Sequence, residues 1–470
     1  MNRIARFGLV LGPLLFLVGV LAPVPPELAG PGQRALAVTA LCMVWWLTTP
    51  VAMPVTSLLG MALLPILGVL DKNEAVALFG NQSVFFVIAA FIIAAVMIRT
   101  GLSTRVTLWA LRRMAGSEDI LAFSVLAVSG LLTSVVVSHA VAALMLPIMM
   151  ETLHALALEP GSRFARRLLL SMAWGTICGS NFTLLSSARA SLALGMYDSF
   201  NQKHGITEST IGFFEYSSGT AIVALVSLAA AYVILRWYHR PEGLDMTPAV
   251  RRLEERAATL GPIRRAEWIT GFTIIAMVLA LMAFGPTYGL GTIALGFAAL
   301  LFTAQVIQWE ETEKFVNWGV ALLYGGAIVV AAGLEETGAV AVLVKMVLPT
   351  GSVNPWAMVV CFALAAALLT EFVSNAAVIA LLLPFALTLA PAVGIEGRAL
   401  VFLLPAAAGL AFALPMSTPA MAMVFGTGYL RPQDSAVPGS LLTFFGVLSL
   451  VLVAMFIWPL FGILIVETLP

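Results

Sequence analysis

The stretch EFVSNAAVIALLLPFAL, residues 371–387, places the polar side chains of Glu371, Ser374 and Asn375 at the start of a long apolar run. Polar groups at the depth of the hydrocarbon core are costly unless partners satisfy them, so they indicate a functional site. The stretch SVVVSHAVAALMLP, residues 134–147, repeats this pattern in the first half of the chain. Two broken, polar-centred hydrophobic segments at matching places in two halves are typical of a transporter's midplane site.

The composition requires a lipid environment. The chain has 470 residues, of which 61% are hydrophobic and 10% are charged, and its mean hydropathy is +1.02. A soluble domain of this length could not hide so much apolar surface, so we predict a lipid bilayer as its surroundings. The net charge is zero, which gives no support to a nucleic-acid partner. Three cysteines stand in apolar runs without metal-ligand spacing, so we interpret them as buried small hydrophobes.

Hydropathy predicts an all-α polytopic membrane protein with about eleven transmembrane helices and two re-entrant hairpins. The hairpins are expected at 120–157 and 355–393, because each segment is too long for one crossing and has a polar centre followed by a proline. The predicted spans cover residues 7–28, 34–52, 54–70, 84–101, 166–190, 211–237, 267–285, 290–307, 318–336, 399–424 and 441–464.

The distribution of Lys and Arg predicts the orientation. Most of them fall on loops that would share one side of the membrane, which the positive-inside rule assigns to the cytoplasm. We therefore expect a multi-pass protein of the cell inner membrane with a cytoplasmic N-terminus. The N-terminal stretch has features of a secretory signal, but a chain this hydrophobic is expected to keep it as the first span. The polar linker 236–266 separates the halves, and TPAVRRLEERAATLG within it predicts a helix at the membrane surface.

The two halves show weak internal symmetry. The segments FFVIAAFIIAAVMIRTG (85–101) and LLYGGAIVVAAGLEETG (322–338) both end in a polar pair and Thr-Gly. Each is followed by a short amphipathic stretch and then by a predicted hairpin. An odd number of spans between corresponding elements would invert the second half, as in transporters with inverted repeats.

Polar groups interrupt the apolar sequence at four places. They are Val137 to His139, Gly179 to Arg189, Glu371 to Asn375, and Pro415 to Pro419. Non-helical backbone at this depth is tolerated only inside protein or along a water-filled cavity. A broken helix offers N–H groups to an anion at one end and carbonyls to a cation at the other. The alternative is that these Ser, Thr and Asn residues join helices to one another.

The chain resembles the divalent anion/sodium symporters, the family of dicarboxylate, citrate and sulfate transporters. The resemblance covers most of the length. It is carried by WWLTTPVAMPVTSLLGMALLPILGVL (45–70), by LLTEFVSNAAVIALLLP (368–384), which is similar to the family's second Ser-Asn-Thr hairpin, and by ALPMSTPAMAMVFGTGYL (413–430). The last segment resembles the family's Thr-Pro-Pro-Asn motif, with Ala420 and Met421 in place of the second Pro and the Asn.

This resemblance implies an elevator mechanism and a homodimer. Residues 1–119 and 267–354 would form the scaffold that holds the dimer, with spans one to four and seven to nine. Residues 120–235 and 355–470 would form the transport part, each with one hairpin and two spans. The linker 236–266 would be cytoplasmic.

The resemblance also implies the site of the second half. Ser374 and Asn375 match the second anion clamp, although Ala376 replaces the family's Thr. Thr418 and Pro419 match the far wall of the substrate pocket. The residues implied for sodium are Thr370, Val373, Asn375 and Ala413.

The first half departs further from the family pattern. Val137, Ser138 and His139 stand in place of Ser-Asn-Thr, so the amide is lost, and Ser187-Ala188-Arg189-Ala190 replaces the partner motif. We expect Ser138, His139, Ser187 and Arg189 to face the substrate. Arg189 would supply a permanent charge and His139 one that depends on pH. The resemblance implies Na⁺ at one site, leaves a second site open, and involves no organic cofactor.

Three alternatives concern single residues. Arg189 would otherwise snorkel outward or pair with backbone carbonyls. His139 would otherwise be a neutral, hydrogen-bonded tip residue. Glu371 is expected to anchor its hairpin to neighbouring backbone or to a basic group rather than to touch substrate.

The predicted function is secondary active transport of small divalent anions, either di- or tricarboxylates or sulfate, coupled to Na⁺, H⁺ or both. The alternative is an ion antiporter or arsenite-type permease of the same plan, which would be expected to carry Asp in its spans, and the predicted spans contain none. An enzyme is not predicted, because the four histidines are scattered. A receptor or structural protein would not need two matching broken hairpins.

Overall fold

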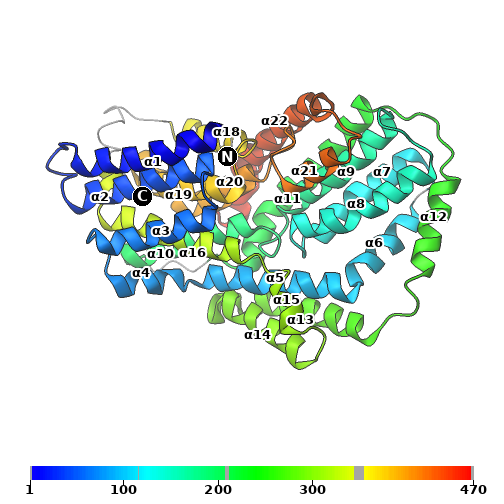
Figure 1. Ribbon diagram of the computed structural model, residues 1–470, viewed down its shortest axis with the longest axis horizontal. Helices are drawn as coiled ribbons and strands as arrows, with labels where there is room; N and C mark the ends of the chain where they lie inside the picture. The colour runs from blue at the N-terminus through cyan, green and yellow to red at the C-terminus, as the bar shows by residue number, and fades with distance from the viewer. Residues whose placement is uncertain (1–2, 115, 207–210, 343–353, 467–470) are drawn as a thin grey trace.

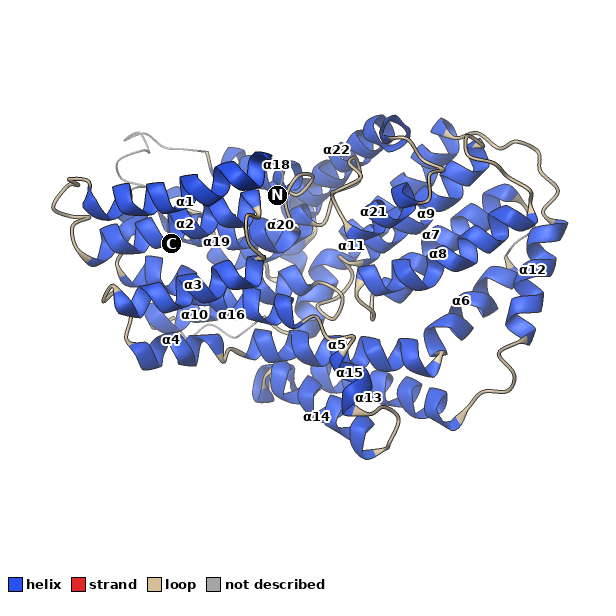
Figure 2. Cartoon of the chain, in the orientation of Figure 1, coloured by secondary structure: helices blue, strands red, loops and turns tan. Residues whose placement is uncertain are grey.

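The computed structural model describes residues 3–114, 116–206, 211–342 and 354–466. Within these ranges every extended regular element is helical (Figure 2), and the single β-type pairing is an isolated bridge between Ile395 and Val466. The prediction of an all-α chain is confirmed. The predicted scaffold section 267–354 includes 343–353, which lie outside the described residues.

The first six helices begin in a group at the left of Figure 1, and the last two of them extend along the lower side of the molecule toward the right. They are α1 (Arg3–Leu21), α2 (Pro31–Thr48), α3 (Met53–Ile66), α4 (Lys72–Phe79), α5 (Gln82–Thr100) and α6 (Leu102–Arg113). Side-chain caps start two of them, since Asp71 accepts from the N–H of Asn73 before α4 and Asn81 accepts from that of Ser83 before α5. α1 packs on α2, α2 packs on α3, and α3 packs on α16 (Trp318–Glu336).

The first repeat consists of two interrupted helix pairs and one long helix. They are α7 (Glu118–Thr133), α8 (Ser138–Ala155), α9 (Arg163–Gly179), α10 (Ala188–His204) and α11 (Phe213–Tyr238). The predicted hairpin is thus two helices separated at 134–137. The predicted interruption after Gly179 is also present, but the predicted span end at 190 is wrong, because α10 continues to His204. The continuation lies beyond the predicted span and contains Asp198, whereas the predicted spans themselves contain no Asp.

The linker and the helices that follow it form the middle of the chain. They are α12 (Thr247–Ala258), α13 (Arg265–Tyr288), α14 (Leu290–Thr303), α15 (Trp309–Glu313) and α16. The helix predicted in the linker is confirmed as α12, which packs on α6 and α8. Its Arg252 and Arg256 both form ion pairs with Glu151 of α8. The linker is therefore tied to the first hairpin by charge as well as by packing.

The second repeat mirrors the first. Its elements are α18 (Pro355–Leu369), α19 (Asn375–Val393), α20 (Gly397–Ala408), α21 (Pro419–Gly426), α22 (Pro432–Phe456) and the 3₁₀ turn η1 (Trp458–Phe461). The predicted span 399–424 is interrupted as expected, at 409–418. The two hairpins are in register: the starts of α7 and α18 (118 and 355), the N-caps Val137 and Ser374, and the prolines Pro147 and Pro384 are each 237 positions apart.

The two repeats exchange their broken helices. α9 packs on α7 and α8 of its own repeat, whereas its continuation α10 packs on α19 and α20 of the other. In the same way α20 packs on α18 and α19, while α21 packs on α8 and α9. Each broken helix therefore crosses from one hairpin to the other, and both breaks lie where the repeats meet (Figure 1).

Glycine allows the first hairpin to pack tightly. A Cβ added to Gly175 would lie 2.4 Å from the carbonyl oxygen of Leu126, and one added to Gly179 would lie 2.3 Å from that of Gly130. No side chain fits at these positions, so the backbones of α7 and α9 are in direct contact, as is common between helices in membranes.

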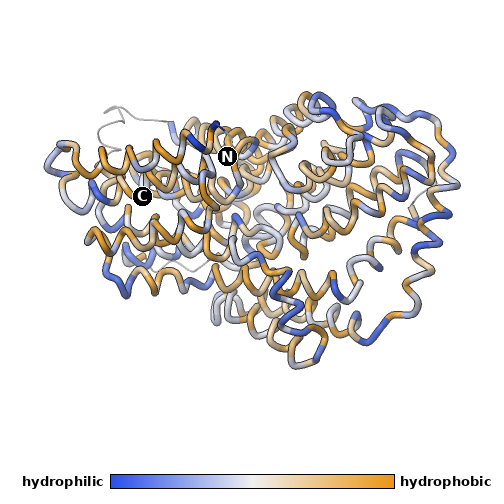
Figure 3. Tube along the Cα trace, in the orientation of Figure 1, coloured by the Kyte–Doolittle hydropathy of each residue, from blue (hydrophilic) through white to orange (hydrophobic). Residues whose placement is uncertain are grey.

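The surface agrees with a membrane environment. Within the described ranges, seven helices are long and apolar enough to span a bilayer, and α3, α14, α18 and α20 are shorter apolar helices. Large apolar side chains are exposed, for example Leu21 at 78% and Phe272 at 74%, which would be unfavourable in water. Figure 3 shows apolar residues along most helices and hydrophilic ones concentrated at turns and along α12. The protein is a multi-pass membrane protein, while the count of eleven spans and the depth of the hairpins stay predictions.

Candidate functional site

A cavity of about 560 Å³ lies where the two hairpin tips meet the two broken helices. Its volume is in the range of small-molecule sites. Seven of the residues predicted to contact substrate line it, namely Ser138, His139, Arg189, Ser374, Asn375, Thr418 and Pro419. Ser187 does not line it, because its side chain is fully buried behind the start of α10. The cavity thus unites residues that lie more than half the chain apart.

Four helices begin at this cavity. Their first or second residues are Ser138 in α8, Ala188 in α10, Asn375 in α19 and Pro419 in α21, and all four line its wall. The N-terminus of a helix carries unpaired N–H groups and the positive end of the helix dipole. Four such ends around one space create a site for negative charge that belongs to no single repeat.

The caps of these helices differ between the repeats. The Oγ of Ser374 accepts a hydrogen bond from Ala377 N at 3.3 Å, and the Oγ1 of Thr418 accepts one from Met421 N at 3.2 Å. Val137, the corresponding residue before α8, has no side-chain acceptor. The first turn of α8 therefore depends on water or on a bound ligand to satisfy its N–H groups.

Arg189 is the most heavily bonded side chain of the site, and only 6% of it is exposed. Its Nε donates to the carbonyl of Pro405 at 2.7 Å, and its Nη2 donates to Asn181 Oδ1 at 2.5 Å and to Ser180 Oγ at 3.1 Å. No described residue accepts from its Nη1. Because Arg189 lines the cavity, Nη1 is the nitrogen available to a bound anion.

The partners of Arg189 match one of the two alternatives that the sequence left open. The guanidinium does not snorkel outward, and it contacts the backbone carbonyls of Ser180 and Pro405. Ser180 and Asn181 were recognised in the sequence as a break but were not assigned to the site. The feature of the sequence that could have assigned them to the site is the Gly-Ser-Asn triplet at the end of an apolar helix.

A cluster of oxygen atoms lies at the second tip. The Oγ1 of Thr370 is 2.6 Å from Asn375 Oδ1 and 3.0 Å from the carbonyl oxygen of Ala408. A hydroxyl has one proton, so it can donate to only one of these two acceptors at a time. Three oxygens that share one proton form an electron-rich group of the kind that hard cations bind.

The predicted sodium residues divide into two groups. Thr370 and Asn375 are bonded to each other, and Val373 lines the cavity beside Asn375. The carbonyl of Ala413, in contrast, accepts a hydrogen bond from Ser435 Oγ at 2.7 Å. The backbone oxygen that faces Thr370 is that of Ala408, which the sequence did not indicate.

Glu371 holds the second hairpin to the loop of the broken helix. Its Oε1 accepts from the N–H groups of Phe412 and Ala413 at 2.9 and 3.0 Å, and its Oε2 accepts from Leu414 at 2.9 Å. Glu371 is not among the residues that line the cavity. The prediction that this carboxylate anchors the hairpin to backbone is confirmed.

His139 connects the cavity to a second hollow. This groove of about 540 Å³ shares Phe91, Val137 and His139 with the cavity and extends to Arg256 and Lys314. The His139 ring lies 6.3 Å from the Phe91 ring, measured between centroids. The imidazole therefore stands between the polar tips and a path lined at its far end by basic residues.

One wall of the cavity comes from the helices outside the two repeats. Met53 is the first residue of α3 and Phe91 belongs to α5, while Asn317 is the N-cap of α16 and Tyr324 lies within α16. None of these positions was predicted, because they lie in ordinary apolar spans or at their ends. Only the packing of α5 and α16 against the repeats brings them to the site.

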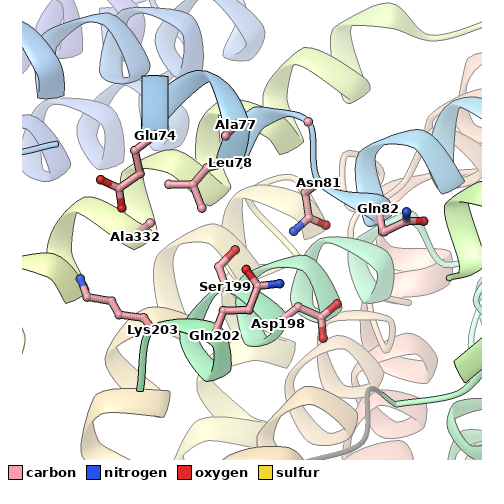
Figure 4. A pocket seen from close by; sticks show the side chains of 11 residues that line it. Glu74, Ala77, Leu78, Asn81, Gln82, Asp198, Ser199, Gln202, Lys203 and Ala332 are labelled. Carbon is pink, nitrogen blue, oxygen red and sulfur yellow. The ribbon is translucent and has the colours of Figure 1, made fainter. Parts of the chain in front are cut away.

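Another hollow, of about 510 Å³, lies between α4, α5 and α10. Figure 4 shows the carboxylate of Asp198 and the ammonium of Lys203 at opposite ends of it. Lys203 is paired with Glu336, and Glu74 adds a further carboxylate to the lining. With its acidic groups and its one basic group already paired, this hollow is less suited to an anion than the cavity at the tips.

Nearly the whole chain is similar in sequence to one family of membrane proteins and to its characterised relatives. The family described as "Sodium:sulfate symporter transmembrane region" matches residues 6–464. The sodium-dependent dicarboxylate transporter SdcS of Staphylococcus saprophyticus is 28% identical over 496 residues, covering 98% of this chain and 93% of the relative. SdcS of Staphylococcus aureus is likewise 28% identical, over 491 residues, with the same coverage.

Two solved structures share the fold at low sequence identity. The YdaH transporter of Alcanivorax borkumensis matches with a TM-score of 0.55 at 14% identity, over 98% of this chain and 100% of that one. MtrF of Neisseria gonorrhoeae matches with a TM-score of 0.56 at 13% identity, over 100% of this chain and 98% of that one. At these identities the likeness concerns the arrangement of helices alone.

Proposed function

Since the chain belongs to the divalent anion/sodium symporter family, and is thus a transporter rather than an enzyme, we propose that it is a sodium-coupled carrier of small dicarboxylates. The observation that carries this proposal is the convergence of four helix N-termini and Arg189 on one cavity. This arrangement supplies positive potential without any basic side chain exposed to bulk water. A dianion entering it exchanges water for fixed N–H donors.

The geometry supports a substrate with two separate anionic ends. The helix N-termini come as pairs, α8 with α21 and α10 with α19, since these helices pack on each other across the repeats. A dicarboxylate of four carbons could present one carboxylate to each pair. Arg189 Nη1 would add a charged donor at one of them. SdcS, which matches along nearly its whole length, is named as a dicarboxylate transporter, and this supports the choice over sulfate or citrate.

We assign the coupling ion to the oxygen cluster of Thr370, Asn375 and Ala408. It lies directly beside the N-terminus of α19, so an ion there would stabilise the tip that faces the anion. Ion and substrate would then favour each other's binding, which is the requirement for cotransport. The name of SdcS as sodium-dependent supports Na⁺ as this ion.

Alternating access would occur by an elevator movement. The scaffold, 1–119 and 267–354, would stay fixed, and the transport part, 120–235 and 355–470, would carry the site across. Two features support this movement. Each broken helix packs on the hairpin of the other repeat, which joins the repeats into one compact body. The cavity lies where this body meets α5 and α16. The groove toward Arg256 and Lys314 would be the exit to the cytoplasm, so this conformation would face inward.

The remaining assignments follow from the same plan. We propose a cytoplasmic N-terminus in the cell inner membrane, because α12 and the C-terminal ends of α5 and α6 carry clustered arginines. We also propose a homodimer formed by the scaffold. Cross-linking of single-cysteine variants on α13 and α14, in membranes, tests the dimer without assuming the substrate.

Uptake by proteoliposomes tests the function. We expect an inward sodium gradient to drive accumulation of radiolabelled succinate, and unlabelled C4-dicarboxylates to compete better than citrate or sulfate. Replacing sodium by potassium on both sides controls for leakage. Equal uptake with both cations would contradict sodium coupling, and preferential competition by sulfate would contradict the substrate class.

A further inference from the structure

The two repeats share a backbone plan but hold opposite buried charges near the cavity. At a spacing of 237 positions, Ser134 of the first tip corresponds to Glu371 of the second. On the broken helices the relation is reversed, because the second residue of α10 is Arg189 and the second residue of α21 is Ala420. One repeat therefore contains a buried cation at its break, and the other contains a buried anion at its tip.

Arg189 is bonded in the manner of a metal ion. All its protein partners are oxygens, and they come from the carbonyl ends of α9 and α20 together with a hydroxyl and an amide. In the described part of the chain it forms no ion pair with a carboxylate. Carbonyl, hydroxyl and amide oxygens at the negative ends of helices are the ligands expected for a small cation. The guanidinium occupies such a set permanently.

A glycine in the backbone of the other repeat leaves the space that the Arg189 guanidinium occupies. A Cβ added to Gly409, the residue that caps α20, would lie 2.1 Å from Arg189 Nη2 and 2.6 Å from Asn181 Oδ1. The backbone at Gly409 has φ −86°, which any residue adopts. Glycine is needed here only because the guanidinium and its amide partner fill the space of a side chain.

The second repeat offers the same type of ligands without a basic side chain. Thr370, Asn375 and Ala408 contribute hydroxyl, amide and carbonyl oxygens, and none of the described Arg, Lys or His residues bonds to them. The adjacent Glu371 is 6% exposed and forms no ion pair within the described ranges. A cation bound at this cluster would balance a buried charge whose other partners are backbone N–H groups and the hydroxyl of Thr443.

We infer that Arg189 is a tethered cation that replaces one coupling ion, so that each chain binds a single sodium ion, at the second tip. This rests on the proposed function. The fixed charge moves with the substrate in every cycle and is never released. The carrier therefore obtains the charge balance of two cations while only one follows the sodium gradient.

Sodium stoichiometry tests the inference on the intact protein in detergent and in proteoliposomes. We expect about one ²²Na⁺ bound per chain and a Hill coefficient of about 1 for sodium-driven succinate uptake, because the coefficient is limited by the number of sites. Two bound ions with a coefficient near 2 would overturn the inference while leaving the proposed function intact. Absence of sodium-driven succinate uptake would instead overturn the proposed function.

A matched pair of variants locates the ion. Thr370→Val removes the hydroxyl of the oxygen cluster, and Thr133→Val makes the same change at the corresponding position of the first tip. Thr133 Oγ1 donates only to the Ser129 carbonyl four residues back, so its loss affects no shared ligand set. We expect Thr370→Val to weaken sodium affinity about tenfold or more, and Thr133→Val to leave it unchanged. Equal weakening by both would show that the first repeat also binds sodium and would overturn the inference.

Discussion

The first and second hairpins differ in where their charge is held, although their helices begin and bend at matching positions. The first tip is apolar at its cap, Val137, and obtains its charge from Arg189 on the broken helix that crosses over from the first repeat to the second hairpin. The second tip carries Glu371, Ser374 and Asn375 itself. The two repeats thus keep the same backbone geometry while their buried charges differ in sign and in the element that carries them.

This comparison also explains why the site lies between the repeats. The carbonyl of Pro405 in α20 accepts from Arg189 in α10, and Asn181 donates to Ala406 at 3.4 Å. Each repeat therefore completes the polar groups of the other. Movement of one repeat without the other would leave buried polar atoms unpaired, at a cost of about 1–3 kcal/mol for each. The repeats are expected to move together.

The largest expected effect comes from Arg189→Ala. Removing the guanidinium leaves Asn181 Oδ1 without its donor and the Pro405 carbonyl with only the N–H of Gly409, and it removes the positive charge from the cavity wall. We expect succinate uptake to fall at least about a hundredfold, in line with loss of a buried charged contact, while the protein still elutes as a folded species in size-exclusion chromatography.

The matched control for this variant is Arg251→Ala, an arginine on α12 whose side chain is 82% exposed. It should transport normally. Addition of millimolar guanidinium to Arg189→Ala should restore part of the uptake. Normal uptake by Arg189→Ala without any addition would remove this residue from the mechanism.

Glu371→Gln tests the anion of the second repeat. The amide group retains one acceptor oxygen, but its NH₂ would face a backbone N–H, so the tip loses contact with 412–414. We expect a loss of stability of about 3 kcal/mol, since a buried charged acceptor of three bonds is replaced. Thermal unfolding in detergent measures this.

The sodium affinity of Glu371→Gln provides a second test of the difference between the two hairpin tips. If Glu371 balances a bound cation, Glu371→Gln should also weaken sodium affinity, whereas Ser134→Ala at the corresponding first-tip position should not. Unchanged affinity in Glu371→Gln would assign the carboxylate a purely structural role.

Gly409→Ala perturbs Arg189 without deleting it. The added methyl would lie 2.1 Å from Nη2, so the guanidinium must move from its carbonyl partners. Overpacking of this kind costs about 1–3 kcal/mol, which corresponds to roughly a tenfold loss of uptake. Gly426→Ala is the control, because nothing lies within 4 Å of a Cβ at that position. Equal uptake by both variants would mean that the guanidinium can shift freely.

The smallest effect is expected from His139→Asn. The ring lines both the cavity and the groove, but none of the described residues accepts or donates a hydrogen bond to it. We expect uptake to change less than about threefold and its dependence on pH to flatten, because the substitution removes the imidazole that could change charge. A pH profile identical to that of the unmodified protein would exclude His139 from proton coupling.

Much of the architecture could be predicted because its signals are local. Hydropathy gave the helices, prolines and Ser, Thr or Asn caps marked their starts, and Gly179 and Pro415 marked the two interruptions. The prediction missed the end of α10 at His204, because Asp198, Asn201 and Gln202 lower its hydropathy below that of a typical span. Burial of α10 among α5, α16, α19 and α20 compensates for this polarity, and no local signal reports it.

By itself, the sequence determined the membrane environment, the helical class, the duplicated hairpins and the polar residues that interrupt them, since each depends on the composition of a short segment. Only the tertiary structure decided that Ser187 does not line the cavity and that the Ala413 carbonyl bonds to Ser435. It also decided that Ala408 faces Thr370, that Gly409 lines the cavity, and that Arg189 bonds to Pro405, 216 positions away. The physical reason is that backbone carbonyls are present in every residue. Which of them face a charge depends on how helices cross, and not on the side chains they carry.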